Sequence, residues 1–141
     1  MGNYFYDMLP AEEREQLKYI PTVPEFVTWI EQKWGDLPAV SNIETTYSYK
    51  QMCERIARRR AYLNGLGLQK GDKVAIWEKT SIDAVEMFLA TLSAGYVGII
   101  LPTGLPEQAV VGCCMKFGVK ALAVRDEFAA RVAGAPCQVI S

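Results

Sequence analysis

The sequence predicts an α/β fold with a doubly wound, mostly parallel sheet that is flanked by helices. One observation is a helix that ends at Gly95 and is followed at once by an uncharged apolar strand over residues 96–101. A second is the apolar strand over residues 74–77, and a third is the helical spacing of apolar residues over 81–94. Because near-continuous apolar strands alternate with helices in parallel sheets that are covered on both faces, these segments predict a βαβ unit.

The N-terminal part of the chain predicts two helices and a hairpin. A proline and several acidic residues fit the first turn of a short polar helix over residues 10–19. Thr22 fits the N-cap of a second helix, which we expect to end at Gly35. Two short strands are expected next, over residues 38–43 and 45–47, around a polar turn.

The next helix has a sequence signature at each end. Ser48 and Gln51 stand three residues apart as in a capping box, in which each side chain accepts a hydrogen bond from a backbone N–H at the helix start. Glycines at 65 and 67 fit its C-terminal turn. The apolar line of this helix consists of Tyr49, Met52, Ile56, Leu63 and Leu66.

The same alternation of helix and strand continues to the end of the chain. Thr80 or Ser81 is expected to cap the helix of the βαβ unit, whose predicted buried side consists of Ile82, Val85, Phe88, Leu89 and Leu92. A helix over 107–117 stops at Gly118, and its apolar positions are Ala109, Val110, Cys113, Cys114 and Phe117. Residues 119–124 predict a strand, 126–132 a weaker helix and 137–140 a last strand.

Composition indicates a globular, cytoplasmic protein with a core of its own. Half of the residues are hydrophobic, and a chain of this length buries roughly 70% of its unfolded surface. The start of the chain lacks a secretory signal pattern. Residues 87–106 carry no charge and approach the length of a membrane span. Because glycines and prolines interrupt that stretch, we interpret it as a helix followed by a buried strand, with no transmembrane segment.

Cysteines and charges give no sign of a metal site or of nucleic-acid binding. The four cysteines form no CxxC pair and the chain has no histidine, so we expect reduced core thiols. Basic residues gather on the helix that follows Ser48, at Lys50, Arg55, Arg58, Arg59 and Arg60. Because no aromatic platform accompanies them, we interpret them as a solvated helix face, paired with the acidic N-terminal segment.

Candidate chemical residues each have a simpler structural explanation. The glycine-rich segment 65–71 runs from helix to strand, whereas phosphate loops run from strand to helix, so we predict a turn. Asp83 and Glu86 stand at a helix start, where the helix dipole favours acidic residues. Thr80 and Ser81 follow a strand and could contact an anion there, but helix capping explains them. We therefore assign no catalytic, cofactor-binding or metal-binding residue.

Three sequence segments in order resemble the N-terminal portion of the adenylate-forming superfamily, which contains acyl-CoA synthetases, peptide-synthetase adenylation domains and luciferases. Residues 46–52 are similar to the "TYxEL" helix start of that superfamily, and residues 65–77 to its "GLxxGDxVAI" turn and strand. Residues 88–102 are similar to its "ALxAGxxxVPL" helix and strand. The sequence departs from the usual motifs of the superfamily at two places, so the subfamily stays open. These are Lys79-Thr80-Ser81 after the second strand and Pro102-Thr103-Gly104 after the third strand.

The resemblance implies a fold and an enzyme. It implies that residues 1–20 are an N-terminal extension with a short helix, and that 21–141 are an incomplete N-terminal α/β subdomain of a truncated synthetase. The family joins a carboxylate to the α-phosphate of ATP and passes the acyl group to a thiol. Its phosphate loop would be expected beyond Ser141, so the chain alone is expected to be an inactive scaffold that binds no cofactor.

Three functions stay open at this point. The first is an N-terminal fragment of a fatty-acid-CoA ligase, whose full-length parent would use ATP, magnesium and coenzyme A on a small carboxylate. The second is an adenylation domain that serves a carrier protein or an aryl acid, and the third is a free-standing, non-enzymatic α/β binding module. The expected partner is the remainder of the parent chain, and exposed apolar helix faces lead us to expect self-association.

Overall fold

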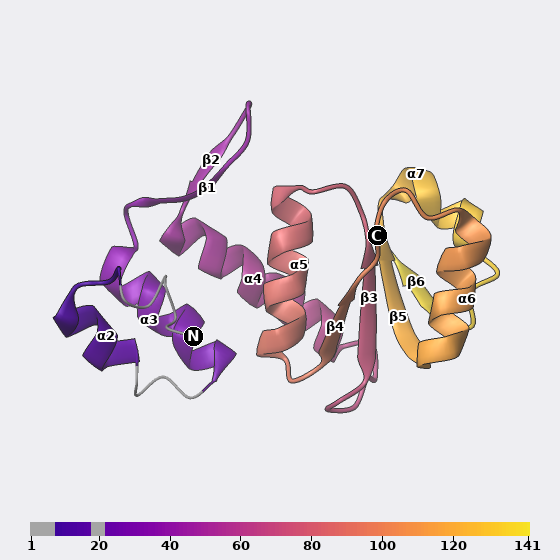
Figure 1. Cartoon of the computed structure of the whole chain (residues 1–141), viewed down its shortest axis with the longest axis horizontal. Coiled ribbons are helices and arrows are strands. Elements are labelled where there is room, and N and C mark those ends of the chain that lie inside the picture. The colour runs from indigo at the N-terminus through magenta and orange to yellow at the C-terminus, as the bar shows by residue number, and fades with distance from the viewer. Residues whose placement is uncertain (1–7, 18–21) are drawn as a thin grey trace.

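A four-stranded parallel sheet forms the centre of the computed structural model, which describes residues 8–17 and 22–141. The strand order is β4-β3-β5-β6 and every neighbouring pair is parallel, so the predicted doubly wound parallel sheet is confirmed (Figure 1). The bounds are β3 Lys73–Trp77, β4 Val97–Ile100, β5 Val119–Val124 and β6 Gln138–Ile140.

Strand β3 is buried on both faces because its side chains alternate between two separate cores. Val74 and Ile76 belong to one core, whereas Ala75 and Trp77 belong to the other. The pairing of β3 with β5 shifts register once, since Lys73 pairs with Val119 but the next pair is Val74 with Ala121. A strand that is buried on both faces shows no alternation of polar and apolar residues, which explains why its sequence reads as one apolar run.

Helices cover both faces of the sheet (Figure 1). On the first face lie α4 (Tyr49–Asn64) and α5 (Ile82–Ser93), and α3 (Val23–Trp34) packs on α4. On the second face lies α6 (Glu107–Phe117), with the 3₁₀ turn η1 (Ala130–Val132) against it. The short helix α7 (Asp126–Ala129) leads into η1, so the helix predicted over 126–132 is divided between an α-helical and a 3₁₀ part.

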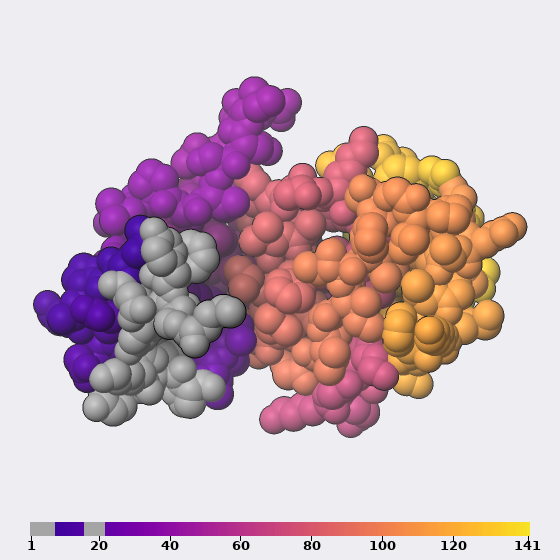
Figure 2. Space-filling model, in the orientation of Figure 1, coloured from indigo at the N-terminus to yellow at the C-terminus, as the bar shows by residue number. Residues whose placement is uncertain are grey.

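The first helices and the hairpin lie at one end of the molecule. Helix α2 (Ala11–Leu17) is joined to α3 by an ion pair of Glu13 with Lys33, with an N···O distance of 3.6 Å. The antiparallel strands β1 (Pro38–Ser41) and β2 (Thr46–Ser48) form a hairpin that projects from the body (Figures 1 and 2). The predicted end of the first helix at Tyr19 lies outside the described residues, and the division of the chain at residue 20 stays a prediction.

The predicted start of α4 and the predicted glycine stops of α5 and α6 are confirmed. Both hydrogen bonds of the capping box are present, from Gln51 N to Ser48 Oγ at 3.3 Å and from Ser48 N to Gln51 Oε1 at 2.9 Å. Gly95 and Gly118 have φ values of +83° and +63°, in the left-handed region that favours glycine. The start of α4 and the ends of α5 and α6 therefore lie where the sequence predicted them.

The predicted buried side of α5 is partly wrong. Val85 is 42% exposed, and Phe88, Leu89 and Leu92 are only partly buried. The fully buried positions of this helix include Glu86, Ala90 and Thr91 instead. The helix turns a narrower, more polar stripe toward α4 and leaves part of its apolar stripe uncovered. On α6, the apolar position Phe117 is 41% exposed.

The stretch predicted as helix and strand rather than a membrane span is confirmed as α5 and β4. Among the residues that the structure describes, no helix has the length and apolar character needed to cross a membrane.

Candidate functional site

The strongest candidate site is a cleft at the carboxyl edge of the sheet, which we call the carboxyl-edge cleft. From β3 the chain crosses to β4 on one side, whereas from β5 it proceeds to β6 on the other, so the strand order reverses between β3 and β5. Open α/β sheets usually bind ligands at such a reversal. The cleft has a volume of about 350 Å³ and is lined by Arg59, Glu78, Asp83, Met87, Ala123, Val124, Arg125, Asp126, Glu127, Ile140 and Ser141.

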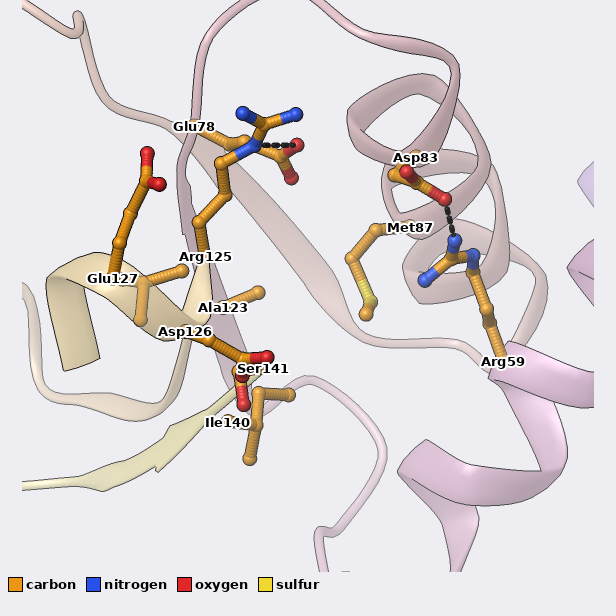
Figure 3. Close-up of a pocket in the computed structure, with 11 residues that line it drawn as sticks. Arg59, Glu78, Asp83, Met87, Ala123, Arg125, Asp126, Glu127, Ile140 and Ser141 are labelled. Carbon is orange, nitrogen blue, oxygen red and sulfur yellow. Dashed lines mark hydrogen bonds and ion pairs between the residues drawn. The ribbon is translucent and has the colours of Figure 1, made fainter.

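One wall of the cleft is a hydrogen-bonded network around Glu78, the residue after β3. The Ser81 hydroxyl accepts from Ala84 N at 3.0 Å, which caps α5, and it donates to Glu78 Oε1 at 2.8 Å. Arg125, the residue after β5, donates from Nε to the same oxygen at 3.3 Å (Figure 3). Ser81 is therefore the helix cap that the sequence predicted, and the cap is tied to the ends of two neighbouring strands.

The opposite wall is an ion-pair cluster between α4 and α5, which we call the arginine cluster. Arg55 Nε donates to Glu86 Oε1 at 2.6 Å, and Arg59 Nε donates to Glu86 Oε2 at 3.2 Å. Asp83 Oδ1 accepts from Arg55 Nη2 at 3.0 Å. It also accepts from Arg59 Nη2, and Figure 3 shows this second interaction. The Glu86 side chain is fully buried, and the hydrogen bond that Arg55 donates to Glu86 raises the pKa of Arg55. The guanidinium of Arg55 also stacks over the ring of Tyr47, 4.6 Å from its centroid.

The arginine cluster corrects two predictions. Arg55 and Arg59 do not form a solvated face that pairs with the N-terminal segment, because their partners are Asp83 and Glu86 of α5. The helix dipole alone does not explain the acid at Glu86, because its side chain is buried and pairs with both guanidinium groups. Of the five basic residues on this helix, Lys50 and Arg58 are exposed, as predicted, whereas Arg60 is half-buried.

The charges of the carboxyl-edge cleft do not fit a nucleotide phosphate. Its lining includes four carboxylates and two guanidinium groups, and both guanidinium groups already pair with carboxylates of the same walls. A phosphate placed there would find no unpaired cation among the lining side chains and would be repelled by the carboxylates of Asp126 and Glu127. Within residues 8–17 and 22–141, no group of His, Cys, Asp and Glu side chains is arranged to hold a metal ion.

The other sequence candidates have structural roles. The segment 65–71 forms the turn between α4 and β3, as predicted. All four cysteines are free, with Cys53 and Cys114 buried and the other two half-buried, as expected for core thiols. Glu78 and Arg125 were missed by sequence reasoning, although each is a charged residue directly after an apolar strand. A charged residue directly after an apolar strand of a parallel sheet is the pattern that would have identified both as candidate site residues.

Comparison with known proteins identifies the family. A doubly wound parallel sheet with its cleft at the carboxyl edge defines an α/β protein of the class that usually binds ligands at that edge. The family model described as "AMP-binding enzyme" matches residues 26–140. The chain belongs to this family of AMP-binding enzymes and is a part of the adenylate-forming superfamily fold, so the resemblance found in the sequence is confirmed.

The matches to individual relatives span most of this chain, but this chain spans only a small part of each relative's length. Tenellin synthetase of Beauveria bassiana is 34% identical over 86 residues, which are 61% of this chain and 2% of that protein. The Klebsiella oxytoca NpsA N-terminal subdomain in complex with anthranilyl-AMSN is 25% identical with a TM-score of 0.77, over 85% of this chain and 31% of that one. A benzoate CoA ligase from Burkholderia xenovorans LB400 shares the fold, with a TM-score of 0.76 at 18% identity, over 84% of this chain and 25% of that one.

Proposed function

We propose that this chain is a scaffold part of an enzyme that activates a carboxylic acid as its acyl-adenylate. The match of residues 26–140 to the AMP-binding enzyme family carries the proposal. In the proposed reaction a carboxylate oxygen attacks the α-phosphorus of ATP, and the bond to pyrophosphate breaks. A thiol then attacks the acyl carbon, which releases AMP and leaves a thioester.

The chemistry would be supplied by parts of the parent enzyme outside this chain. The carboxyl-edge cleft supports this division, because its two guanidinium groups are paired and its remaining charges are acidic. We therefore assign ATP and magnesium to the parent and expect residues 1–141 alone to be inactive. A cytoplasmic location belongs to the same proposal, since ATP and a thiol acceptor are both available there.

For the acid and the thiol, we favour an aryl acid and a carrier-protein thiol. The aryl acid is supported by the similarity to NpsA in complex with anthranilyl-AMSN, and the carrier protein by the similarity to the artificially fused NpsA-ThdA adenylation-PCP di-domain, both at 25% identity. A CoA ligase, for a fatty or an aryl acid, is the second candidate. The similarity to the benzoate CoA ligase favours it, although at 18% identity that similarity concerns the fold alone.

The test is ATP–pyrophosphate exchange by the parent enzyme that contains these residues. Hydroxybenzoates, aminobenzoates, fatty acids and amino acids would be compared as substrates, with residues 1–141 alone as the control. We expect exchange with an aryl acid, followed by acyl transfer to a phosphopantetheinylated carrier protein rather than to coenzyme A. Exchange with fatty acids and transfer to coenzyme A would support the second candidate. No exchange with any acid would favour a free-standing binding module and refute the proposal.

A further inference from the structure

Two cysteines that are far apart in the sequence meet at the amino edge of the sheet. Cys114 lies in the last turn of α6, and Cys137 is the residue before β6. The chain passes from α6 directly into β5, and β6 runs parallel to β5, so the end of α6 and the start of β6 lie at the same edge. Both side chains pack in the core on the second face of the sheet. The topology therefore brings the two thiols together.

The two thiols are in direct contact. The Cys114 thiol donates a hydrogen bond to the sulfur of Cys137. Cys114 lies on the buried side of α6, since Val110, one turn earlier, is also fully buried. Cys113 is only half-buried and, as the adjacent helix residue, points about 100° away from Cys114. Cys114 rather than Cys113 is therefore the partner of Cys137.

The two thiols differ in their access to solvent. Cys114 is 0% exposed, whereas Cys137 is half-buried. Burial raises the pKa of both thiols, that of Cys114 to about 12, but the hydrogen bond from Cys114 partly offsets this rise in the pKa of Cys137. A reagent in solution therefore reaches Cys137 first, and Cys137 forms the reactive thiolate more readily. Cys114 is held beside it and is shielded from the reagent.

We propose that Cys114 and Cys137 form a reversible disulfide when the protein meets hydrogen peroxide, and that this bond fastens β6 to α6. In the first step the Cys137 thiolate attacks one peroxide oxygen and the O–O bond breaks. Cys137 becomes a sulfenic acid, and the departing hydroxide takes up a proton and leaves as water.

The second step uses the buried thiol. The Cys114 sulfur attacks the Cys137 sulfur, the S–O bond breaks and the S–S bond forms. The proton of Cys114 and the hydroxyl group of the sulfenic acid leave as a second molecule of water. In total the two sulfurs lose two electrons and the peroxide gains them. Because the two side chains are already in contact, this step requires no unfolding of the chain.

The disulfide would hold a short edge strand in place. Strand β6 has three residues and pairs only with β5, and its last residue, Ile140, lines the carboxyl-edge cleft. A bond from Cys114 to Cys137 closes β5, α7 and η1 into one loop, which restricts the opened chain and so opposes the separation of β6. The thiols themselves lie at the opposite edge from the cleft, so the disulfide is independent of the acid that the parent enzyme activates.

The experiment treats residues 1–141 with hydrogen peroxide in dilute solution at about pH 8, where some thiolate is present, and then alkylates the remaining thiols in urea. Peptide mapping should show a disulfide between Cys114 and Cys137 of the same molecule, with Cys53 and Cys113 alkylated. Dithiothreitol should restore all four thiols. Sulfinic acid at Cys137 without a disulfide, a disulfide from Cys113, or a disulfide between two molecules would overturn the proposal.

Three serine variants identify the partners. Cys113→Ser is the matched control, because it removes the neighbouring half-buried thiol and should leave the yield of disulfide unchanged. Cys114→Ser and Cys137→Ser should each reduce the yield to background. In Cys114→Ser, peroxide should carry Cys137 on to sulfinic acid, because no thiol is present to capture the sulfenic acid. Loss of the disulfide in Cys113→Ser would show that Cys113 takes part and would refute the assignment.

Hydrogen exchange of the wild-type chain measures whether the disulfide fastens β6, without any substitution. The amides of β6 should exchange about 10-fold or more slowly in the oxidised than in the reduced protein, because the disulfide opposes local opening. Those of the hairpin formed by β1 and β2 should be unchanged. Equal exchange of the β6 amides in the two forms would contradict the proposed effect on this strand.

Discussion

Replacing Glu86 by glutamine should destabilise the protein far more than the matched change at Asp83. Glu86 is fully buried and accepts hydrogen bonds from Arg55 and Arg59. Glu86→Gln keeps the shape of the side chain but removes its charge, so two guanidinium groups would face each other with only Asp83 between them. Asp83 is 51% exposed, so Asp83→Asn leaves the central carboxylate in place and water close to the altered group.

The expected magnitudes follow from burial. Removing one partner of a buried ion pair typically costs about 3–5 kcal/mol. The arginine side chains are 26% exposed and keep some contact with water, so we expect about 3 kcal/mol for Glu86→Gln. For Asp83→Asn we expect about 1 kcal/mol or less, as for exposed pairs. The larger loss would remove a substantial part of the 5–15 kcal/mol that is typical of a folded domain.

Urea denaturation followed by circular dichroism measures both changes. The loss in Asp83→Asn should shrink at high salt, whereas the loss in Glu86→Gln should persist, because buried charges are screened much less. A double-mutant cycle of Glu86→Gln with Arg55→Met should give a combined loss smaller than the sum of the single losses. Equal losses for Glu86→Gln and Asp83→Asn would refute the argument that burial makes Glu86 the central partner.

Two further predictions concern glycines and thiols. Gly98→Ala should lower the free energy of unfolding by about 1–3 kcal/mol, because the added Cβ atom would lie 2.7 Å from the ring of Phe88. Gly112→Ala in α6 should raise the free energy of unfolding by about 0.5–1 kcal/mol, because alanine is the better helix former and its Cβ atom would meet no atom within 4 Å. Thermal unfolding of both variants would show this, and equal shifts would contradict it. Burial raises the pKa of Cys53 to about 11 and that of Cys114 to about 12. Both thiols should therefore resist alkylation at pH 8 until urea is added, and labelling of either in the folded protein would contradict the burial. The unfolded chain loses these thiol protons from roughly pH 8.5, whereas the folded protein keeps them to a higher pH. The stability that comes from burying the two neutral thiols is therefore complete below roughly pH 8.5, and the free energy of unfolding should decline as the pH rises toward 11.

The elements of the fold could be predicted because their signals are local. The capping residues Ser48 and Ser81 and the glycines at 95 and 118 begin or end helices through contacts within a few residues. Strand β5 spans the predicted residues 119–124, and helix α6 spans the predicted residues 107–117. Boundaries of the other strands moved by one or two residues, since pairing with a neighbour decides where a strand ends.

The predictions that failed depend on which surfaces meet. The apolar stripe of α5 looked like its buried side, but contact with the arginines of α4 buries Glu86 and leaves Val85 partly exposed. Helical spacing gives the faces of a helix but does not say which of them meets a neighbour. For the same reason Glu78 and Arg125, 47 residues apart in the chain, gave no sequence signal of their hydrogen bond.

The position of β3 between β4 and β5 has a consequence for how the protein is made. Synthesis completes β3 before either of its neighbours, and the strand that pairs with its second edge ends only at Val124. Until then an apolar strand has one edge without a partner on the growing chain. Both edges can close within one molecule only after the ribosome has delivered β5, so a pause in translation before that point would leave β3 open to contact with other chains or with chaperones.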